Sequence, residues 1–215
     1  MIVRAVAVGA FQENAYVLVD ETSGDAVLID PGEEGGRLLE IARDAGGTIG
    51  AIWLTHAHID HVGGIAAVKR QMDVPIFLHQ ADRPLYDNAA QQAMMFGLRI
   101  ETPPQPEREL AEGDVLHCGS LAFSVWHVPG HSPGHVCIHG HGVAFVGDCL
   151  FAGSVGRTDL PLSSPGDLAT SLSRLMALPD DTVVYSGHGP STTIAAERQS
   201  NPFLNGTVRL IEGER

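Results

Sequence analysis

The sequence is poor in positive charge and contains a single lysine, Lys69. Its 13 lysine and arginine residues face 26 aspartate and glutamate residues, which gives a formal net charge of −13 at pH 7. Because no basic stripe is available to neutralise phosphates, the composition argues against binding of nucleic acid or of an anionic membrane. An anionic small molecule is still acceptable as a ligand, since a bound divalent ion would dominate the local field.

Cysteine and long apolar segments are also scarce. The three cysteines, Cys118, Cys137 and Cys149, are odd in number and lack CxxC spacing, which favours a reduced, cytoplasmic protein. Residues 1–20 have no basic start followed by a continuous apolar core, and no apolar run approaches membrane-spanning length. We therefore expect a cytoplasmic protein without a membrane partner; no pattern indicates a particular oligomeric state.

The length and composition indicate one globular domain over residues 1–215, with 44% hydrophobic and 18% charged residues. Short β-type runs precede helical patterns in each half, which predicts an α+β fold of two sheets packed face to face with helices outside. The predicted strands are Val3–Val8, Tyr16–Val19, Ala26–Ile29, Ile49–Leu54, Ile76–Leu78, Val115–Cys118, Ala122–Val128, His135–His139, Val143–Val146 and Thr182–Tyr185. The predicted helices are Glu33–Ala45, His61–Gln71, one or two helices within Gln80–Leu98, Asp167–Ala177 and Thr193–Gln199.

A cluster of histidines directly follows the predicted strand Ile49–Leu54. It contains His56, His58, Asp60 and His61, and imidazole nitrogen and carboxylate oxygen are the donors that bind Zn²⁺ and similar cations. Extended residues two apart point the same way, so His56 and His58 can share one ion. Asp60 and His61 begin the next predicted helix and can turn toward a second ion.

Three further candidates each follow a predicted strand and lie beside glycine, which permits tight turns. They are His131, Asp148 and His188. With the histidine cluster they make seven candidate ligands, too many for one tetrahedral zinc but suited to two ions bridged by a carboxylate. We assign His56, His58 and His131 to the first ion, Asp60, His61 and His188 to the second, and the bridge to Asp148.

This HxHxDH motif, followed by a histidine, an aspartate and a histidine, resembles that of the metallo-β-lactamase superfamily. Within it, the chain is similar to the small glyoxalase II-like hydrolases of the hydroxyacylglutathione hydrolase type. The matching segments are Phe11–Tyr16, Pro129–His135, Gly147–Pro161, His188–Pro190 and Asn201–Leu204. The resemblance implies a four-layer αββα sandwich with two divalent ions, zinc or else iron or manganese, at one edge. It also implies hydrolysis of S-lactoylglutathione-like thioesters through a hydroxide that bridges the ions.

One departure concerns the substrate, because full-length glyoxalase II enzymes carry a C-terminal helical domain that contacts glutathione. The stretch after His188 is too short for such a domain, which puts glutathione specificity in doubt. The main alternative is a persulfide dioxygenase with a single Fe(II) on the equivalents of His56, His131 and Asp148. A β-lactamase or a non-catalytic metal-binding module is less favoured.

Other residues near the motifs have candidate roles. Asp60 can shuttle protons in addition to binding metal. Arg157 can hold a substrate carboxylate or brace its loop through Asp159. His135 is a candidate for holding a ligand imidazole in place. Residues 94–96, Met-Met-Phe, are expected to pack into the core, with a place at the lip of the pocket as the alternative.

Overall fold

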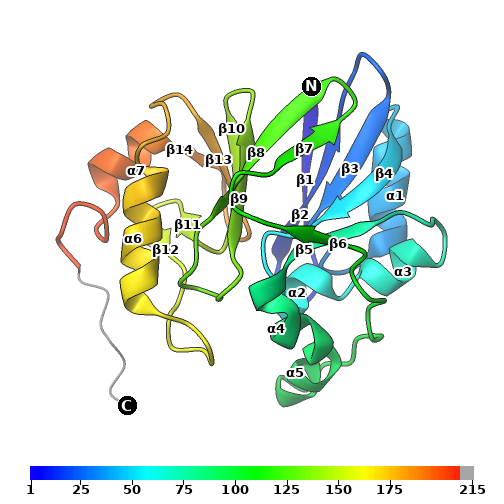
Figure 1. Cartoon of the computed structure of the whole chain (residues 1–215), viewed down its shortest axis with the longest axis horizontal. Coiled ribbons are helices and arrows are strands. Elements are labelled where there is room, and N and C mark those ends of the chain that lie inside the picture. The colour runs from blue at the N-terminus through cyan, green and yellow to red at the C-terminus, as the bar shows by residue number, and fades with distance from the viewer. Residues whose placement is uncertain (209–215) are drawn as a thin grey trace.

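Two six-stranded sheets form the centre of the molecule (Figure 1). The structure is a computed structural model that describes residues 1–208; the end of the expected 1–215 domain, residues 209–215, lies outside that range. In order across the first sheet, the strands are β1 (Ile2–Val8), β2 (Glu13–Val19), β3 (Asp25–Ile29), β4 (Thr48–Trp53), β5 (Ile76–His79) and β6 (Arg108–Leu110). Across the second they are β14 (Thr192–Thr193), β13 (Val183–Ser186), β10 (Val143–Gly147), β9 (Val136–Gly140), β8 (Leu121–His127) and β7 (Val115–Cys118). A separate hairpin joins β11 (Leu150–Phe151) and β12 (Ser154–Val155).

Helices flank the pair of sheets on both sides (Figure 1). On the side of the first sheet lie α1 (Gly35–Asp44), α2 (Ile59–Val62), α3 (Ile65–Lys69), the 3₁₀ turn η1 (Gln80–Asp82), α4 (Arg83–Asp87) and α5 (Ala89–Met95). On the side of the second lie α6 (Pro165–Leu175) and α7 (Ile194–Ser200). The predicted αββα sandwich is confirmed. Within residues 1–208, every helix falls short of the length and apolar character needed to cross a membrane.

Three clusters of buried apolar side chains hold the four layers together. In β2, Ala15, Val17 and Val19 join the cluster shared with α1 and α3, whereas Tyr16 and Leu18 join the cluster between the sheets. This division follows from the strand geometry, since successive side chains point to opposite faces. The layer between the sheets also contains Trp53, Phe123, Val125, Ile138 and Phe145. A third cluster packs α6 and α7 against the second sheet.

The directions of the strands explain where the candidate ligands meet. In the first sheet, β3, β4, β5 and β6 are parallel. In the second, β8 and β10 are both antiparallel to β9 and so run the same way, and β13 is parallel to β10. The loops that follow β8, β10 and β13 therefore leave from one edge of the second sheet, where they meet the loop that follows β4.

The predicted helix His61–Gln71 is wrong in its extent, because the structure divides this region into α2 and α3 at Gly63 and Gly64. The loop of Pro31 and Gly32 packs directly against the break. A Cβ atom on Gly63 would lie 2.6 Å from the Gly32 carbonyl oxygen, and one on Gly64 would lie 2.7 Å from the Pro31 carbonyl oxygen. The two glycines thus permit an approach of two backbone segments that no side chain would allow.

The other differences come from elements too short to give a periodic pattern, and the two-residue strands β11, β12 and β14 were not predicted either. β6 was not predicted, because its three residues include two exposed charged ones and it is defined by parallel pairing with β5. The segment Gln80–Leu98 contains η1, α4 and α5 in place of one or two helices. Most remaining boundaries agree with the prediction within a few residues, which is the usual uncertainty of helix and strand ends.

We expect Gly64→Ala to destabilise the protein by about 1–3 kcal/mol, because the new methyl group must displace the Pro31 carbonyl. Gly36→Ala in α1 is the matched control, since the nearest atom to its added Cβ would be 3.6 Å away. The control should be neutral or slightly stabilising, because alanine favours a helix over glycine. Chemical denaturation of both variants measures the difference, and equal stabilities would contradict the proposed role of the glycine.

Candidate metal centre

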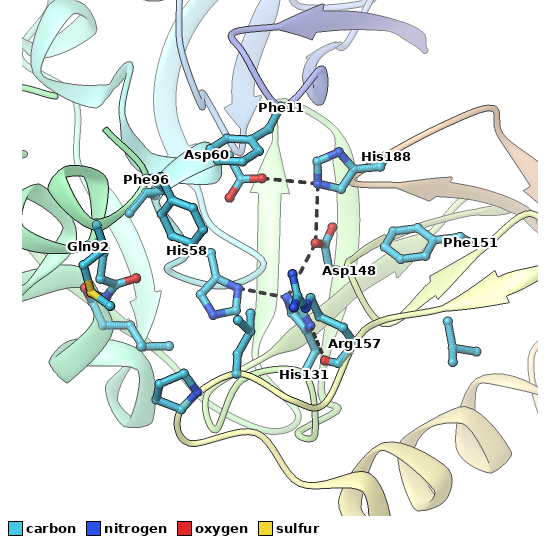
Figure 2. A pocket seen from close by; sticks show the side chains of 16 residues that line it. Phe11, His58, Asp60, Gln92, Phe96, His131, Asp148, Phe151, Arg157 and His188 are labelled. Carbon is cyan, nitrogen blue, oxygen red and sulfur yellow. Dashed lines mark hydrogen bonds and ion pairs between the residues drawn. The ribbon is translucent and has the colours of Figure 1, made fainter. Parts of the chain in front are cut away.

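The seven predicted ligands converge at one edge of the two sheets. Figure 2 shows five of them, His58, Asp60, His131, Asp148 and His188. His56 and His58 follow β4, and Asp60 and His61 belong to α2, so these four come from the first half of the chain. The other three follow strands of the second sheet. They are His131 after β8, Asp148 after β10 and His188 after β13.

His56, His58 and His131 form the first group. Each offers a ring nitrogen, and the three nitrogens lie within 4.8 Å of one another. His58 Nδ1 and His131 Nε2 are 2.8 Å apart (Figure 2). All three belong to the set that the sequence assigned to the first ion.

Asp60, His61 and His188 form the second group, which the sequence assigned to the second ion. Their donor atoms also lie within 4.8 Å of one another. His188 Nε2 lies 3.2 Å from Asp60 Oδ2.

Asp148 lies between the two groups. Its Oδ1 is 3.4 Å from His61 Nε2, and its Oδ2 is 3.5 Å from both His131 Nε2 and His188 Nε2. The Oδ1 atom is buried and has no hydrogen-bond partner within the described structure. One carboxylate therefore contacts imidazoles of both groups.

The orientation of the imidazoles fits a metal centre. His56 Nδ1 lies 3.1 Å from Thr55 Oγ1, whose own hydrogen goes to Asp30, so this nitrogen donates and Nε2 keeps its lone pair. His131 Nδ1 likewise donates to the carbonyl oxygen of Arg157 at 2.9 Å. His56 Nε2 and His61 Nε2 are buried without a partner in the described structure. Such atoms cost about 1–3 kcal/mol each when unsatisfied, and a divalent cation would satisfy them.

Asp30 is a residue of the candidate centre that the sequence analysis did not identify. Its buried carboxylate accepts hydrogen bonds from Thr55 N at 2.7 Å, Thr55 Oγ1 at 2.6 Å and His61 Nδ1 at 3.1 Å. Its oxygens are thus occupied in orienting two ligand-bearing segments, although they lie close enough to His56 and His61 to form a third candidate group. Its position directly after the predicted strand Ala26–Ile29 was the available signal, since the other candidates share it.

Asp82 was also missed, and no sequence pattern distinguishes it. Its buried carboxylate accepts hydrogen bonds from Ala57 N at 2.9 Å, Ser132 Oγ at 2.8 Å and Gly134 N at 2.5 Å. These bonds join the loop of His58 to the loop of His131, which come from different sheets.

His135 and Arg157 lie close to the centre but make different contacts from the ligands. The ring of His135 stacks on that of His56, with centroids 4.6 Å apart, and its Nε2 donates to the Val146 carbonyl at 2.9 Å. It therefore packs against a candidate ligand without a hydrogen bond to it. The Arg157 guanidinium makes a bidentate ion pair with Asp159 at 2.6 and 2.7 Å. Of the two roles considered for Arg157, this contact corresponds to bracing its loop and not to holding a substrate carboxylate.

The electrostatic environment differs between the two groups. Burial lowers the pKa of His56 well below its usual range and that of His58 to about 3, with neighbouring imidazoles adding to the effect. Burial also opposes the charged form of His61 and His188, but the Asp148 and Asp60 carboxylates raise the pKa of His188 to about 9 and raise that of His61 as well. At pH 7, His56 and His58 of the first group are therefore neutral, whereas His61 and His188 of the second group are protonated.

A cavity of about 530 Å³ opens onto the centre and is lined by His58, Asp60, His131, Asp148 and His188 among others. Met95 and Phe96 also line it and are 82% and 54% exposed, so the expectation that residues 94–96 pack into the core is wrong. Ala89 and Ala93 form the buried face of α5 instead. Because Met95 is the last residue of that helix and Phe96 follows it, their side chains lie at the lip of the cavity.

Known proteins resemble the chain over most of its length. A model of the Metallo-beta-lactamase superfamily matches residues 8–188. Hydroxyacylglutathione hydrolase GloC of Haemophilus influenzae is 38% identical over 210 residues, which cover 95% of this chain and 99% of that protein.

Three solved structures share the fold. The di-iron-bound form of TTHA1623 has a TM-score of 0.87 and 47% identity, with 94% of this chain and 100% of that chain covered. The BLEG-1 B3 metallo-beta-lactamase has a TM-score of 0.89 and 38% identity, with coverages of 95% and 100%. ETHE1 from Myxococcus xanthus has a TM-score of 0.79 and 27% identity, with coverages of 96% and 85%. With its fold, its motif and these similarities in agreement, the chain belongs to the metallo-beta-lactamase superfamily.

Proposed function

We propose that the chain is a hydrolase that cleaves thioesters of the S-lactoylglutathione type at a centre of two divalent ions. The observation that carries this proposal is the place of Asp148, whose carboxylate lies within 3.5 Å of imidazole nitrogens from both candidate groups. A carboxylate that lies between two ligand groups suits a two-metal hydrolytic site. The 38% identity to a hydroxyacylglutathione hydrolase supports the same class of reaction.

In this proposal His56, His58 and His131 hold one ion, Asp60, His61 and His188 hold the other, and Asp148 contacts both. When bound, the ions would polarise the thioester carbonyl and supply hydroxide near neutral pH, since coordination lowers the pKa of water from about 15.7 to about 7. Zinc suits the nitrogen and oxygen donors, as do iron and manganese. The TTHA1623 structure holds iron, which keeps iron in consideration for this chain.

The remaining chemistry concerns the leaving group. A thiol with a pKa of about 8.5 departs as thiolate without a strong acid, whereas an amide nitrogen needs a proton. The carboxylates among the described cavity residues are Asp60 and Asp148, and both are proposed ligands. Asp60 retains one oxygen that does not face His188 and is the residue we propose to move a proton. This balance favours a thioester over a β-lactam, despite the similarity to BLEG-1.

A persulfide dioxygenase is the second candidate function. His56, His131 and Asp148 would suffice for a single Fe(II), and the similarity to ETHE1 is compatible with such an activity. Against it stands the group of Asp60, His61 and His188, whose donor atoms lie together beside Asp148. A single-iron dioxygenase does not need that second group, although such residues can persist without being used. The 38% identity to a hydroxyacylglutathione hydrolase also favours the hydrolase, so we place it first.

The direct test is hydrolysis of S-D-lactoylglutathione by the zinc-reconstituted protein. We expect loss of the thioester absorbance that depends on metal and stops on addition of a chelator, because the proposed reaction needs both ions. Iron at one atom per chain, with oxygen uptake on glutathione persulfide and no thioester cleavage, would assign the dioxygenase instead.

Asp148→Ala should remove metal and activity together. We expect the metal content to fall below the two ions proposed and kcat/KM to drop on the order of 10³-fold, since the ions contribute several kcal/mol to the transition state. Asp73→Ala is the control, because the Asp73 side chain is fully exposed. Elemental analysis and thioester kinetics measure both effects, and an active, metal-replete Asp148→Ala would refute the bridging role.

The two groups should also differ in the pH dependence of zinc binding. At pH 7 the metal-free protein carries protons on His61 and His188, and zinc must displace them, so affinity for this group should rise with pH up to about 9. Burial holds the pKa of His56 well below its usual range and that of His58 at about 3, so these two residues add no such dependence to the first group. Chelator-competition titrations at pH 6, 7 and 8 separate the two sites, and equal slopes would contradict this assignment.

A further inference from the structure

The wall of the cavity beyond the candidate ligands is almost entirely apolar. The apolar residues that line it are Phe11, Ile59, Leu85, Met95, Phe96, Phe151, Val155, Leu160 and Pro161. In Figure 2, Phe11 and Phe96 lie on the side of Asp60 and His58, and Phe151 lies beyond Asp148. A molecule bound beside the ligands would therefore meet apolar surface on both sides.

Three large apolar side chains, those of Phe11, Met95 and Phe96, are exposed at the entrance of the cavity and form its lip. Met95 is 82% exposed, Phe96 54% and Phe11 38%. The rings of Phe11 and Phe96 meet edge to face with centroids 5.6 Å apart, which makes the lip continuous from the turn between β1 and β2 to the end of α5. Contiguous exposed apolar surface at the mouth of a pocket marks a binding site for an apolar group.

Few polar groups are free to recognise a charged substrate. Apart from the candidate ligands, the described residues of the cavity include two with polar side chains, Gln92 and Arg157. The Gln92 amide already donates to the Leu85 carbonyl at 3.0 Å, and Arg157 is held by Asp159. A tripeptide thiol such as glutathione, with two carboxylates and an ammonium group, would find a single arginine in this lining, and that arginine is already paired.

We propose that the preferred substrate is a thioester with an apolar group next to the scissile bond, and that Phe11, Met95 and Phe96 determine this preference. The inference rests on the proposed thioesterase function. The reaction adds water across the thioester, so that the carbon–sulfur bond breaks and a carbon–oxygen bond forms. The products are a carboxylate, a thiol and one proton released to solvent. The apolar group can belong to the acyl or to the thiol side, and the lip serves either one in the same way.

The test is a pair of substrate series with the zinc-loaded protein. In the first, acetyl, butanoyl, hexanoyl and octanoyl thioesters of uncharged N-acetylcysteamine vary the acyl side. In the second, acetyl thioesters of ethyl, butyl and hexyl thiols vary the thiol side. We expect kcat/KM to rise about two- to fourfold for each added methylene in one series, which corresponds to burial of that methylene in an apolar site. The series that rises identifies the side that the lip binds.

The lip is tested by Met95→Gln, which keeps the volume of the side chain and makes it polar. Because Met95 is 82% exposed, the substitution does not threaten folding. The ratio of kcat/KM between the longest and shortest substrates should fall at least threefold. Met94→Gln is the matched control, since Met94 is 64% exposed but does not line the cavity, and it should leave the ratio unchanged.

A readout without turnover uses the carboxylate products as probes. Isothermal titration of butanoate, hexanoate and octanoate should show tighter binding with length in the unmodified protein and in Met94→Gln, and a weaker trend in Met95→Gln. Thioester cleavage with flat profiles in both series, or an equal effect of the two glutamine variants, would overturn the role of the lip while leaving the hydrolase intact. Absence of cleavage with every thioester would refute the proposed function, and the titrations would then decide on the apolar site alone.

Discussion

The apolar layer between the two sheets is the constraint on which the metal centre depends. His56, His58, Asp60 and His61 come from the first sheet and its helix, whereas His131 and the other two candidates follow strands of the second. Neither half contains the complete donor set proposed for either ion, because each of these two groups takes donors from both sheets. Burial of the aromatic and aliphatic side chains between the sheets fixes the position of one sheet edge relative to the other. The hydrophobic effect, which has no preferred direction, thereby positions metal donors that must point in defined directions.

Burying several imidazoles and carboxylates away from water costs free energy, and hydrogen bonds from neighbouring residues offset part of that cost. Asp30 and Thr55 orient His56 and His61, and the Arg157 carbonyl orients His131. These contacts place each Nδ1–H outward and each Nε2 toward the centre, which is the tautomer that a cation needs. His135 shows the contrast, since it donates through Nε2 to a backbone carbonyl and takes no part in the groups.

The apolar cavity next to this polar centre gives the site two recognition principles. In the proposed function, the candidate ligands hold the ions that act on the thioester carbonyl. The lip offers uncharged apolar surface against which an apolar part of the substrate can be buried. Its exposed side chains are where the structure departs most clearly from the expected pattern, since Met95 and Phe96 lie in solvent although their helix buries Ala89 and Ala93. Local disagreement of this kind tends to occur at functional sites, because a binding surface is selected for its ligand and not for the free protein.

The sequence by itself determined the order of the longer strands and helices and the identity of the seven candidate ligands, because both rest on local periodicity and spacing. Only the tertiary structure decided the break between α2 and α3, the support of the ligands by Asp30 and Asp82, and the face that Met95 presents. The physical reason is separation along the chain. Asp30 reaches Thr55 across 25 residues and Asp82 reaches Ser132 across 50, and such contacts depend on how the layers pack and not on any pattern within one segment.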